Sequence, residues 1–297
     1  MQNTFQLKGS IVAIVTPFLE NGAIDFDAFE NLINDHIKAG TDGIVFCGTT
    51  GESPAFTDEE FEAIFSFAVE KAQGKIAVIA GTGTNDTHHC VIRSVQAQKC
   101  GVDALLISSP YYNKPTEEGL YRHFEAIAKS VDLPIILYNV PGRTAVNMTS
   151  RLTLRLANDF ENIVAVKEAS GNLDQVNEIL IHRPKGFLVY SGDDALTLPI
   201  MACGAEGVVS VIANIVPAEF REMVHACLNN DWAKAKKIHQ KLYRLMQLSM
   251  IETNPIPIKT ALFEMGKVLE IFRLPMCPMS SEANRELLKK ELKNLNL

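Results

Sequence analysis

Eight short hydrophobic runs recur along the chain, and none alternates polar with apolar residues as half-exposed strands do. They are rich in Val, Ile and Leu, and they read IVAIVTP from Ile11, GIVFCG from Gly43, KIAVIAG from Lys75, ALLISS from Ala104, PIILYNV from Pro134, IVAVKEAS from Ile163, FLVYSGDD from Phe187 and GVVSVIAN from Gly207. Continuous apolar runs of this length indicate strands buried on both faces of a parallel sheet.

Helical patterns with start signals separate these runs. Asp25 precedes an apolar stripe that Gly40 ends, and Thr57 has Glu60 three residues on, the spacing of a capping box. Asn172 with Gln175 is a weaker version of the same signal. Further helix starts are expected at Thr116, Thr149 and Asp194.

Strands and helices alternate at a spacing of roughly 20–33 residues, which favours an α/β fold of the (β/α)8 TIM-barrel class over an open doubly wound sheet. We expect the barrel and its active site in residues 1–230. Residues 231–297, with helical patterns at 232–250 and 281–295 around the break Asn254-Pro255-Ile256-Pro257, are expected to form a C-terminal helical region packed on the barrel. No low-complexity linker separates the two parts, so an independent second domain is not expected.

Charge and composition exclude several classes of protein. The 297 residues include 28 Lys and Arg against 35 Asp and Glu, a net charge of −7, which argues against partners such as nucleic acid or an anionic membrane surface. No stretch approaches the length of about 18 apolar residues needed to cross a bilayer, and the apolar run at the N-terminus is too short for a secretory signal. The six cysteines are scattered without a CxxC pair, as in a cytoplasmic protein with reduced thiols.

Residues at the ends of barrel strands are the candidates for chemistry, because the βα loops form the functional face of this fold. The second run continues into Gly48-Thr49-Thr50-Gly51-Glu52, a tight turn whose N–H groups and hydroxyls can converge on a small carboxylate. A plain turn with a helix cap explains the same residues equally well.

The fifth and sixth runs end in reactive side chains. Tyr138 closes an apolar strand, and Arg143 five residues on can clamp a carboxylate with two hydrogen bonds. Lys167 directly follows four apolar residues, and poor solvation there disfavours the ammonium and frees an amine for Schiff-base chemistry. Alone, Tyr138 is more typical of a core residue and Lys167 of a solvated loop; together with the turn at Thr49 they favour a function.

Cofactor and metal motifs are missing. Gly81-Thr82-Gly83 lacks the third glycine of a dinucleotide fingerprint, and the chain has no P-loop. His88 and His89 are adjacent, not spaced as helical metal ligands, and the other histidines are solitary. We therefore expect no metal and no cofactor.

With these residues in view, the chain resembles the dihydrodipicolinate synthase family, within the pyruvate-dependent Schiff-base aldolase superfamily that includes N-acetylneuraminate lyase. The resemblance extends from about Gly9 to near the C-terminus. It rests on nine segments in order and at compatible spacings: GSIVAIVTPF, GTTGES, AGTGTN, SPYYNKP, LYNVPGRT, VKEASGNL, SGDDA, GVVSVIAN and NPIPIK.

The resemblance implies roles for individual residues. Lys167 would form the imine with pyruvate, with no other cofactor, and Tyr138, Thr49 and Tyr112 would move protons. Thr50 would hold the carboxylate of pyruvate and Arg143 that of aspartate semialdehyde. Gly192 and Val209 would contribute a backbone carbonyl and wall contacts to the substrate site. In the family the counterpart of Tyr112 enters the neighbouring subunit's site, which implies at least a dimer. Family members are commonly tetramers built as dimers of dimers, so the resemblance implies a homotetramer.

Arg143 also separates the alternatives. A 2-keto-3-deoxy sugar-acid aldolase or an N-acetylneuraminate lyase would present hydroxyl-binding groups to a polyol and would have no arginine here. A barrel that binds pyruvate-like ligands without turnover, or a metal-dependent hydrolase, belongs to a different class. The presence of Lys167 and Tyr138 argues against a binding barrel without turnover. The missing cluster of metal ligands argues against a metal-dependent hydrolase.

The resemblance also implies a regulatory site for lysine. Many bacterial and plant members of the family bind lysine, the pathway end product, through matches to Ser53, Asn85 and Tyr111, all present here. However, His89 takes the place of the acid that grips lysine's amine, and Asp58 and Phe61 replace histidines. Because an imidazole cannot pair with an ammonium as a carboxylate does, weak or absent inhibition by lysine is expected.

Overall fold

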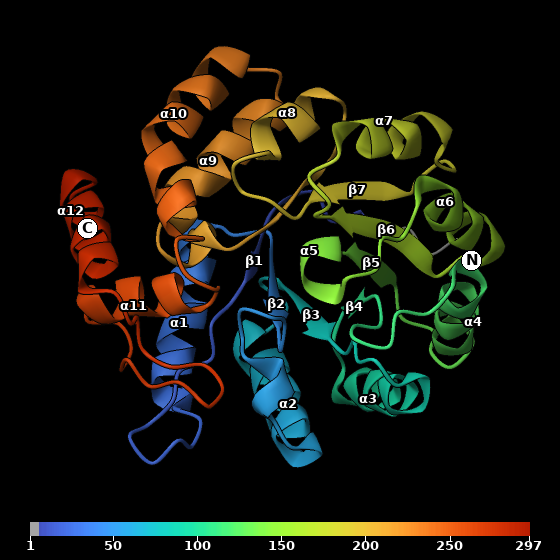
Figure 1. Cartoon of the computed structure of the whole chain (residues 1–297), viewed down its shortest axis with the longest axis horizontal. Helices are drawn as coiled ribbons and strands as arrows, with labels where there is room; N and C mark the ends of the chain where they lie inside the picture. The colour runs from blue at the N-terminus through green and yellow to red at the C-terminus, as the bar shows by residue number, and fades with distance from the viewer. Residues whose placement is uncertain (1–5) are drawn as a thin grey trace.

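Eight parallel strands close into a barrel in the computed structural model, which describes residues 6–297 (Figure 1). Each strand pairs with the next along the chain, and β8 pairs with β1. The strands are β1 Gly9–Ala13, β2 Gly43–Phe46, β3 Ala77–Gly81, β4 Ala104–Ser108, β5 Ile135–Asn139, β6 Ile163–Glu168, β7 Leu188–Ser191 and β8 Gly207–Ser210. The predicted (β/α)8 fold class is confirmed.

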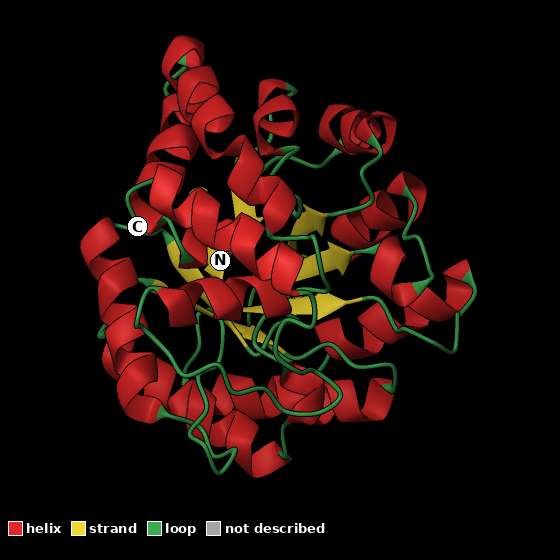
Figure 2. Cartoon of the chain, turned by 60° about the vertical axis from the view of Figure 1, so that its left-hand side comes forward, coloured by secondary structure: helices red, strands yellow, loops and turns green. Residues whose placement is uncertain are grey.

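Helices surround this barrel, as the turned view in Figure 2 shows. Those that follow successive strands are α1 Phe26–Ala39, α2 Asp58–Ala72, α3 Thr87–Cys100, α4 Glu117–Ala128, α6 Ser150–Asp159, α7 Leu173–His182, α8 Thr197–Ala202 and α9 Pro217–Leu228. Three short helices lie within the loops at the carboxyl ends of strands: η1 Ser53–Ala55, α5 Pro141–Thr144 and η2 Ile212–Asn214.

Both faces of the sheet are buried, which explains why the strands read as continuous apolar runs. One cluster fills the interior of the barrel and includes Ile11, Val45, Ile79, Ile136 and Tyr190. A second and larger cluster lies between the strands and the helices. The barrel is therefore a packed core, and only its ends can form a site.

Most predicted helix starts are confirmed. The Asp25 carboxylate accepts from Ala28 N, and Thr57 and Glu60 form the reciprocal capping box. The side chains of Thr116, Thr149 and Asn172 also cap their helices. Asp194 is the exception, because α8 begins only at Thr197.

The buried Asp194 carboxylate instead accepts hydrogen bonds from Val211 N at 3.0 Å and Ile212 N at 2.9 Å. These contacts join the loops after β7 and β8. The prediction of a helix cap was wrong because such partners, 17 and 18 residues away, leave no local signal.

The C-terminal helices α10 Trp232–Leu248, α11 Ile256–Glu264 and α12 Glu282–Asn294 lie along one side of the barrel (Figure 1). Helix α10 packs against α8 and α9, and α11 packs against α12 and η2. The Lys267–Asp35 ion pair, at 2.6 Å, links this region to α1. Among residues 6–297, no helix is long and apolar enough to span a membrane.

Candidate active site

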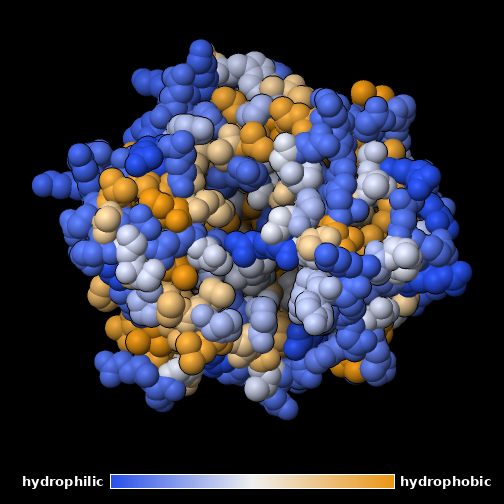
Figure 3. Space-filling view, in the orientation of Figure 1, coloured by the Kyte–Doolittle hydropathy of each residue, from blue (hydrophilic) through white to orange (hydrophobic). Residues whose placement is uncertain are grey.

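A cavity of about 180 Å³ opens at the carboxyl ends of the strands. Figure 3 shows a hollow near the centre of this face, with hydrophilic residues beside it. The cavity brings together six of the residues predicted for the reaction or for substrate binding: Thr49, Thr50, Tyr138, Arg143, Lys167 and Gly192. These residues come from the loops or strand ends of β2, β5, β6 and β7, far apart in the sequence.

Lys167 is held in β6 between β5 and β7, opposite Tyr138 and Tyr190 in the two ladders. It is only 5% exposed. Its Nζ lies 4.1 Å from the centroid of the Tyr138 ring and, within the described residues, has no hydrogen-bond partner. The amine is thus sheltered from bulk water and open to a ligand in the cavity.

A second buried lysine is a useful contrast. Lys259 in α11 has no exposed surface, and its ammonium pairs with Glu52 and donates to Ile271 O at 2.9 Å. Burial lowers the pKa of Lys259 to about 8, opposed by the charge of Glu52. The Lys259 ammonium is held by Glu52 and by the Ile271 carbonyl, and it does not line the cavity. Lys167 is therefore the lysine suited to nucleophilic attack.

The neighbouring Glu168 carboxylate anchors the end of β6, a role that was not predicted from the sequence. It is buried, accepts from Gln175 Nε2 at 2.9 Å and Asn139 Nδ2 at 3.1 Å, and caps Ser170 N at 2.7 Å. This network holds the strand end on which Lys167 stands.

Gly192 is required by the packing around Lys167. A Cβ at this position would lie 2.6 Å from Ala169 Cβ and 3.1 Å from Lys167 Cε. We predict that Gly192→Ala lowers the free energy of unfolding by about 1–3 kcal/mol and slows adduct formation, because the lysine must move. Denaturant unfolding checks this against Gly142→Ala, where an added Cβ meets nothing within 4 Å. Equal stability of the two variants would contradict the packing argument.

The turn after β2 presents Thr49 and Thr50 to the cavity. Thr16 Oγ1 donates to Gly51 O at 2.9 Å, and Gly51 N donates to Gly48 O at 3.1 Å, so the turn is firmly braced. Asn254, from the segment before α11, donates from Nδ2 to Thr50 Oγ1 at 2.9 Å. In the sequence, Asn254 belongs to a proline-broken segment, and no local pattern predicts that it reaches the cavity.

Arg143 stands in the short helix α5, directly after β5. Its guanidinium is exposed at the cavity rim, and Nη2 contacts Asn254 O at 3.5 Å. No carboxylate pairs with Arg143 within residues 6–297, which leaves its donors available for an anionic ligand.

Two of the residues predicted for the reaction or for substrate binding lie outside the cavity. Tyr112, in the loop after β4, is 88% exposed and has a positive φ of 74°. Val209 is buried within the interior cluster of the barrel, and Val211, two residues on, lines the cavity instead. Nor does any hydrogen bond between described residues join Thr49 to Tyr138, so the predicted hydroxyl relay is not connected here.

The residues predicted for a regulatory site come from the loops after β2, β3 and β4 and from α3. Ser53 lines the active-site cavity, whereas Asn85 O accepts from Asn113 Nδ2 at 2.8 Å and Tyr111 is partly exposed. His89 lies on α3 with Nε2 3.0 Å from Asp58 Oδ1.

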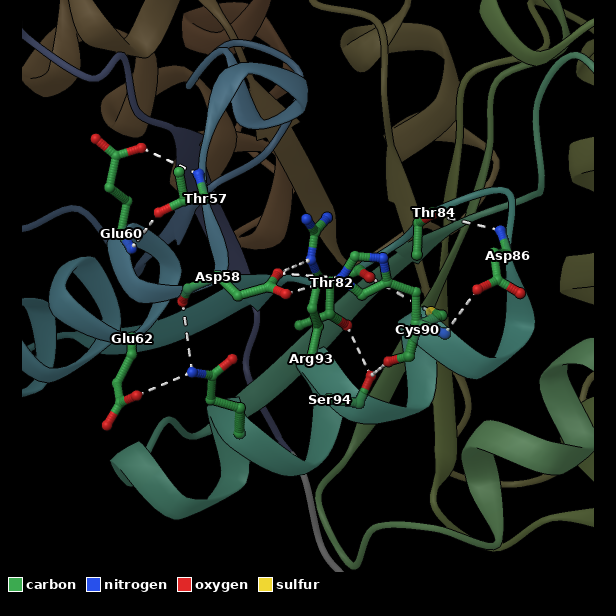
Figure 4. A network of polar contacts seen from close by, with 12 residues as sticks. Thr57, Asp58, Glu60, Glu62, Thr82, Thr84, Asp86, Cys90, Arg93 and Ser94 are labelled. Atoms are coloured by element: carbon green, nitrogen blue, oxygen red, sulfur yellow. Dashed lines mark hydrogen bonds and ion pairs between the residues drawn. The ribbon is translucent and has the colours of Figure 1, made fainter.

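The Asp58 carboxylate, on the surface between α2 and α3, therefore already has a hydrogen-bond partner in His89. Arg93 Nε also donates to it at 3.1 Å, and Figure 4 shows Arg93 reaching the Asp58 carboxylate. The hydrogen bond to His89, with help from Arg93, lowers the pKa of Asp58. The Asp58 carboxylate is thus already engaged by His89 and Arg93.

Within the described part of the chain, no cluster of three or more His, Cys, Asp or Glu residues could hold a metal ion. The polar groups gathered at the cavity include an amine, a phenol, hydroxyls and a guanidinium, together with the Asn254 amide and the Asp193 carboxylate. Such a set can form an imine, move protons and bind carboxylates.

Comparison with known proteins gives a consistent result. A model of the dihydrodipicolinate synthetase family matches residues 6–295. A 4-hydroxy-tetrahydrodipicolinate synthase of Aquifex aeolicus is 49% identical over 290 residues, covering 98% of both chains. The crystal structure of dihydrodipicolinate synthase from the same organism superposes with a TM-score of 0.96, at 49% identity and 98% coverage of both chains. A lysine-bound structure from Cyanidioschyzon merolae has a TM-score of 0.95 at 38% identity, covering 98% of this chain and 99% of that one.

Proposed function

This chain belongs to the dihydrodipicolinate synthetase family, and from that premise we propose that Lys167 condenses pyruvate with L-aspartate 4-semialdehyde in the cavity at the barrel mouth. The activity is that of a 4-hydroxy-tetrahydrodipicolinate synthase, a lyase of the diaminopimelate route to lysine. The observation that carries the assignment of the nucleophile is the sheltered, unpaired Lys167 amine beside Tyr138.

The chemistry follows from an amine and two carboxylate-binding groups. Lys167 attacks the ketone carbon of pyruvate and water leaves, which makes an imine that can accept electrons. A methyl proton then leaves to give an enamine, whose carbon attacks the aldehyde of the second substrate. The amine of that substrate finally attacks the imine carbon and releases Lys167, a ring closure favoured because both groups are in one molecule.

The two substrates are proposed to bind in different parts of the cavity. Thr50, in the braced turn, supplies a hydroxyl to the carboxylate of pyruvate near Lys167. Arg143, at the rim, binds the carboxylate of aspartate semialdehyde. The polyol chain of a sugar-acid aldolase substrate has no carboxylate for an unpaired guanidinium to bind at this position. Arg143 therefore favours the synthase over the sugar-acid aldolase.

Tyr138 is the proposed proton carrier, and Thr49 lines the same cavity. We predict that Tyr138→Phe lowers kcat by about 10²–10³-fold, because the hydroxyl is lost while the ring beside Lys167 remains. Steady-state rates check this, with Tyr243→Phe on the surface of α10 as the matched control. An unchanged kcat would exclude Tyr138 from proton transfer.

A homotetramer, built as a dimer of dimers, completes the proposal. It is supported by the exposed Tyr112, whose counterpart in the family completes a neighbouring site, and by its absence from the cavity of its own chain. Light scattering gives the mass in solution. We also propose a cytoplasmic location, supported by the six free cysteines.

Lysine is predicted to inhibit weakly or not at all. In regulated relatives an acid at the position of His89 pairs with lysine's ammonium, whereas here the nearby Asp58 carboxylate already contacts His89 and Arg93. We expect less than a twofold loss of rate at about 1 mM lysine. Titration of initial rates measures this, and His89→Glu should increase sensitivity. Strong inhibition of the unaltered protein at low lysine would refute the prediction.

The test of the proposed function is a coupled assay with pyruvate and aspartate semialdehyde, in which a reductase consumes the cyclic product and oxidises NADPH. Turnover supports the synthase. If turnover is absent but borohydride still traps pyruvate on the chain, a sugar-derived aldehyde becomes the preferred acceptor and the aldolase chemistry stands.

A further inference from the structure

The segment between α10 and α11 reaches across to the turn after β2. Asn254 in this segment is 4% exposed and lines the cavity together with Thr50 and Arg143. From this contact we infer that Asn254 is a positioning residue, which aims the Thr50 hydroxyl at the carboxylate of the first substrate. The inference rests on the proposed function, because it assigns the ligand of Thr50 as pyruvate.

The direction of one hydrogen bond carries the argument. A threonine hydroxyl has one proton to donate and two lone pairs that accept. Asn254 Nδ2 donates to Thr50 Oγ1 at 2.9 Å and so occupies a lone pair. Within residues 6–297, Thr50 Oγ1 donates to no other group, so its proton remains available to a carboxylate in the cavity.

Burial makes this contact effective. Thr50 is also buried, and in a site shielded from water a fixed donor is not lost to competing solvent. A side chain that accepted from Thr50 instead of donating to it would turn the hydroxyl proton away from the ligand.

A buried ion pair holds the two segments together independently of Asn254. The Lys259 ammonium pairs with Glu52, two residues after Thr50, and Arg273 N donates to the other Glu52 oxygen at 3.1 Å. Replacement of the Asn254 side chain therefore leaves the segment anchored to the turn.

A second contact of Asn254 allows its effect on pyruvate binding to be distinguished from an effect on aspartate semialdehyde binding. Its backbone carbonyl, not its side chain, accepts from Arg143 Nη2 at 3.5 Å. A substitution at 254 removes the support of Thr50 but retains the carbonyl beside Arg143. The effect should therefore fall on pyruvate and spare aspartate semialdehyde.

The experiment compares Asn254→Ala and Asn254→Asp with the unaltered protein and with Asn294→Ala, an exposed asparagine on α12. Borohydride trapping at a series of pyruvate concentrations gives the half-saturation for adduct formation, and steady-state assays give both KM values. We expect the pyruvate half-saturation to rise about tenfold in both Asn254 variants, with the KM for aspartate semialdehyde within about twofold. Asn294→Ala should match the unaltered protein.

A double variant tests whether Asn254 acts through Thr50. In a Thr50→Val background, Asn254→Ala should change the pyruvate half-saturation by less than about twofold, since there is no hydroxyl left to aim. A full additional tenfold effect in that background would overturn the inference, as would an unchanged half-saturation in Asn254→Asp. Failure to trap pyruvate on the unaltered protein would instead count against the proposed function, so the two failures are distinguishable.

Discussion

Lys167→Ala is expected to abolish turnover, with a loss on the order of 10⁴-fold or more. The side chain is the unpaired amine in the cavity, and every proposed step passes through its imine with pyruvate. Lys259, the other lysine buried near this end of the barrel, is held by Glu52 and cannot substitute for it. The coupled assay measures the rate, and mass spectrometry after borohydride treatment with pyruvate should show no adduct in the variant.

The control for this experiment is Lys129→Ala, which removes an exposed lysine paired with Glu125 on α4. It should keep both turnover and the adduct. Peptide mapping of the trapped unaltered protein should place the label on Lys167. A label on any other lysine would contradict the mechanism.

The barrel could be predicted from the sequence because its signal is local. A strand buried on both faces must be apolar at successive positions, and the runs at β5 and β6 show this within single stretches of five to six residues. Lys167 and Tyr138 stood out for the same reason, as polar groups ending apolar strands. Parallel strands then place such ends on one face.

What escaped prediction depends on partners distant in the sequence. Asn254 reaches Thr50 across 204 positions and Lys259 reaches Glu52 across 207, and no local pattern encodes such pairs. Asp194 was misjudged as a helix cap because an acid before a helix is the usual local signal, whereas its partners lie after β8. Local sequence patterns predict the helices and strands themselves, but not the contacts that residues of distant segments make with one another.

Tyr112 marks a different limit. A single chain leaves it 88% exposed, so neither its sequence neighbours nor its own fold gives it a catalytic partner. Its proposed role depends on a second copy of the chain.

Arg143→Ala should distinguish binding of the second substrate from the chemistry of the first. Removal of a guanidinium that pairs with a carboxylate is expected to lower kcat/KM for aspartate semialdehyde by about 10²–10³-fold, since such a loss costs about 2–5 kcal/mol. Adduct formation with pyruvate should persist, because Arg143 stands at the rim in α5 while Lys167 stands in β6.

Two further variants sharpen this test. Arg143→Lys retains the charge but not the paired donors, so it should recover only part of the lost kcat/KM. Arg244→Ala, an exposed arginine on α10, should behave as the unaltered protein. Near-normal turnover of Arg143→Ala with aspartate semialdehyde would count heavily against this acceptor. Because the pyruvate adduct would still form, the search for the true acceptor would then turn to aldehydes without a carboxylate at that position.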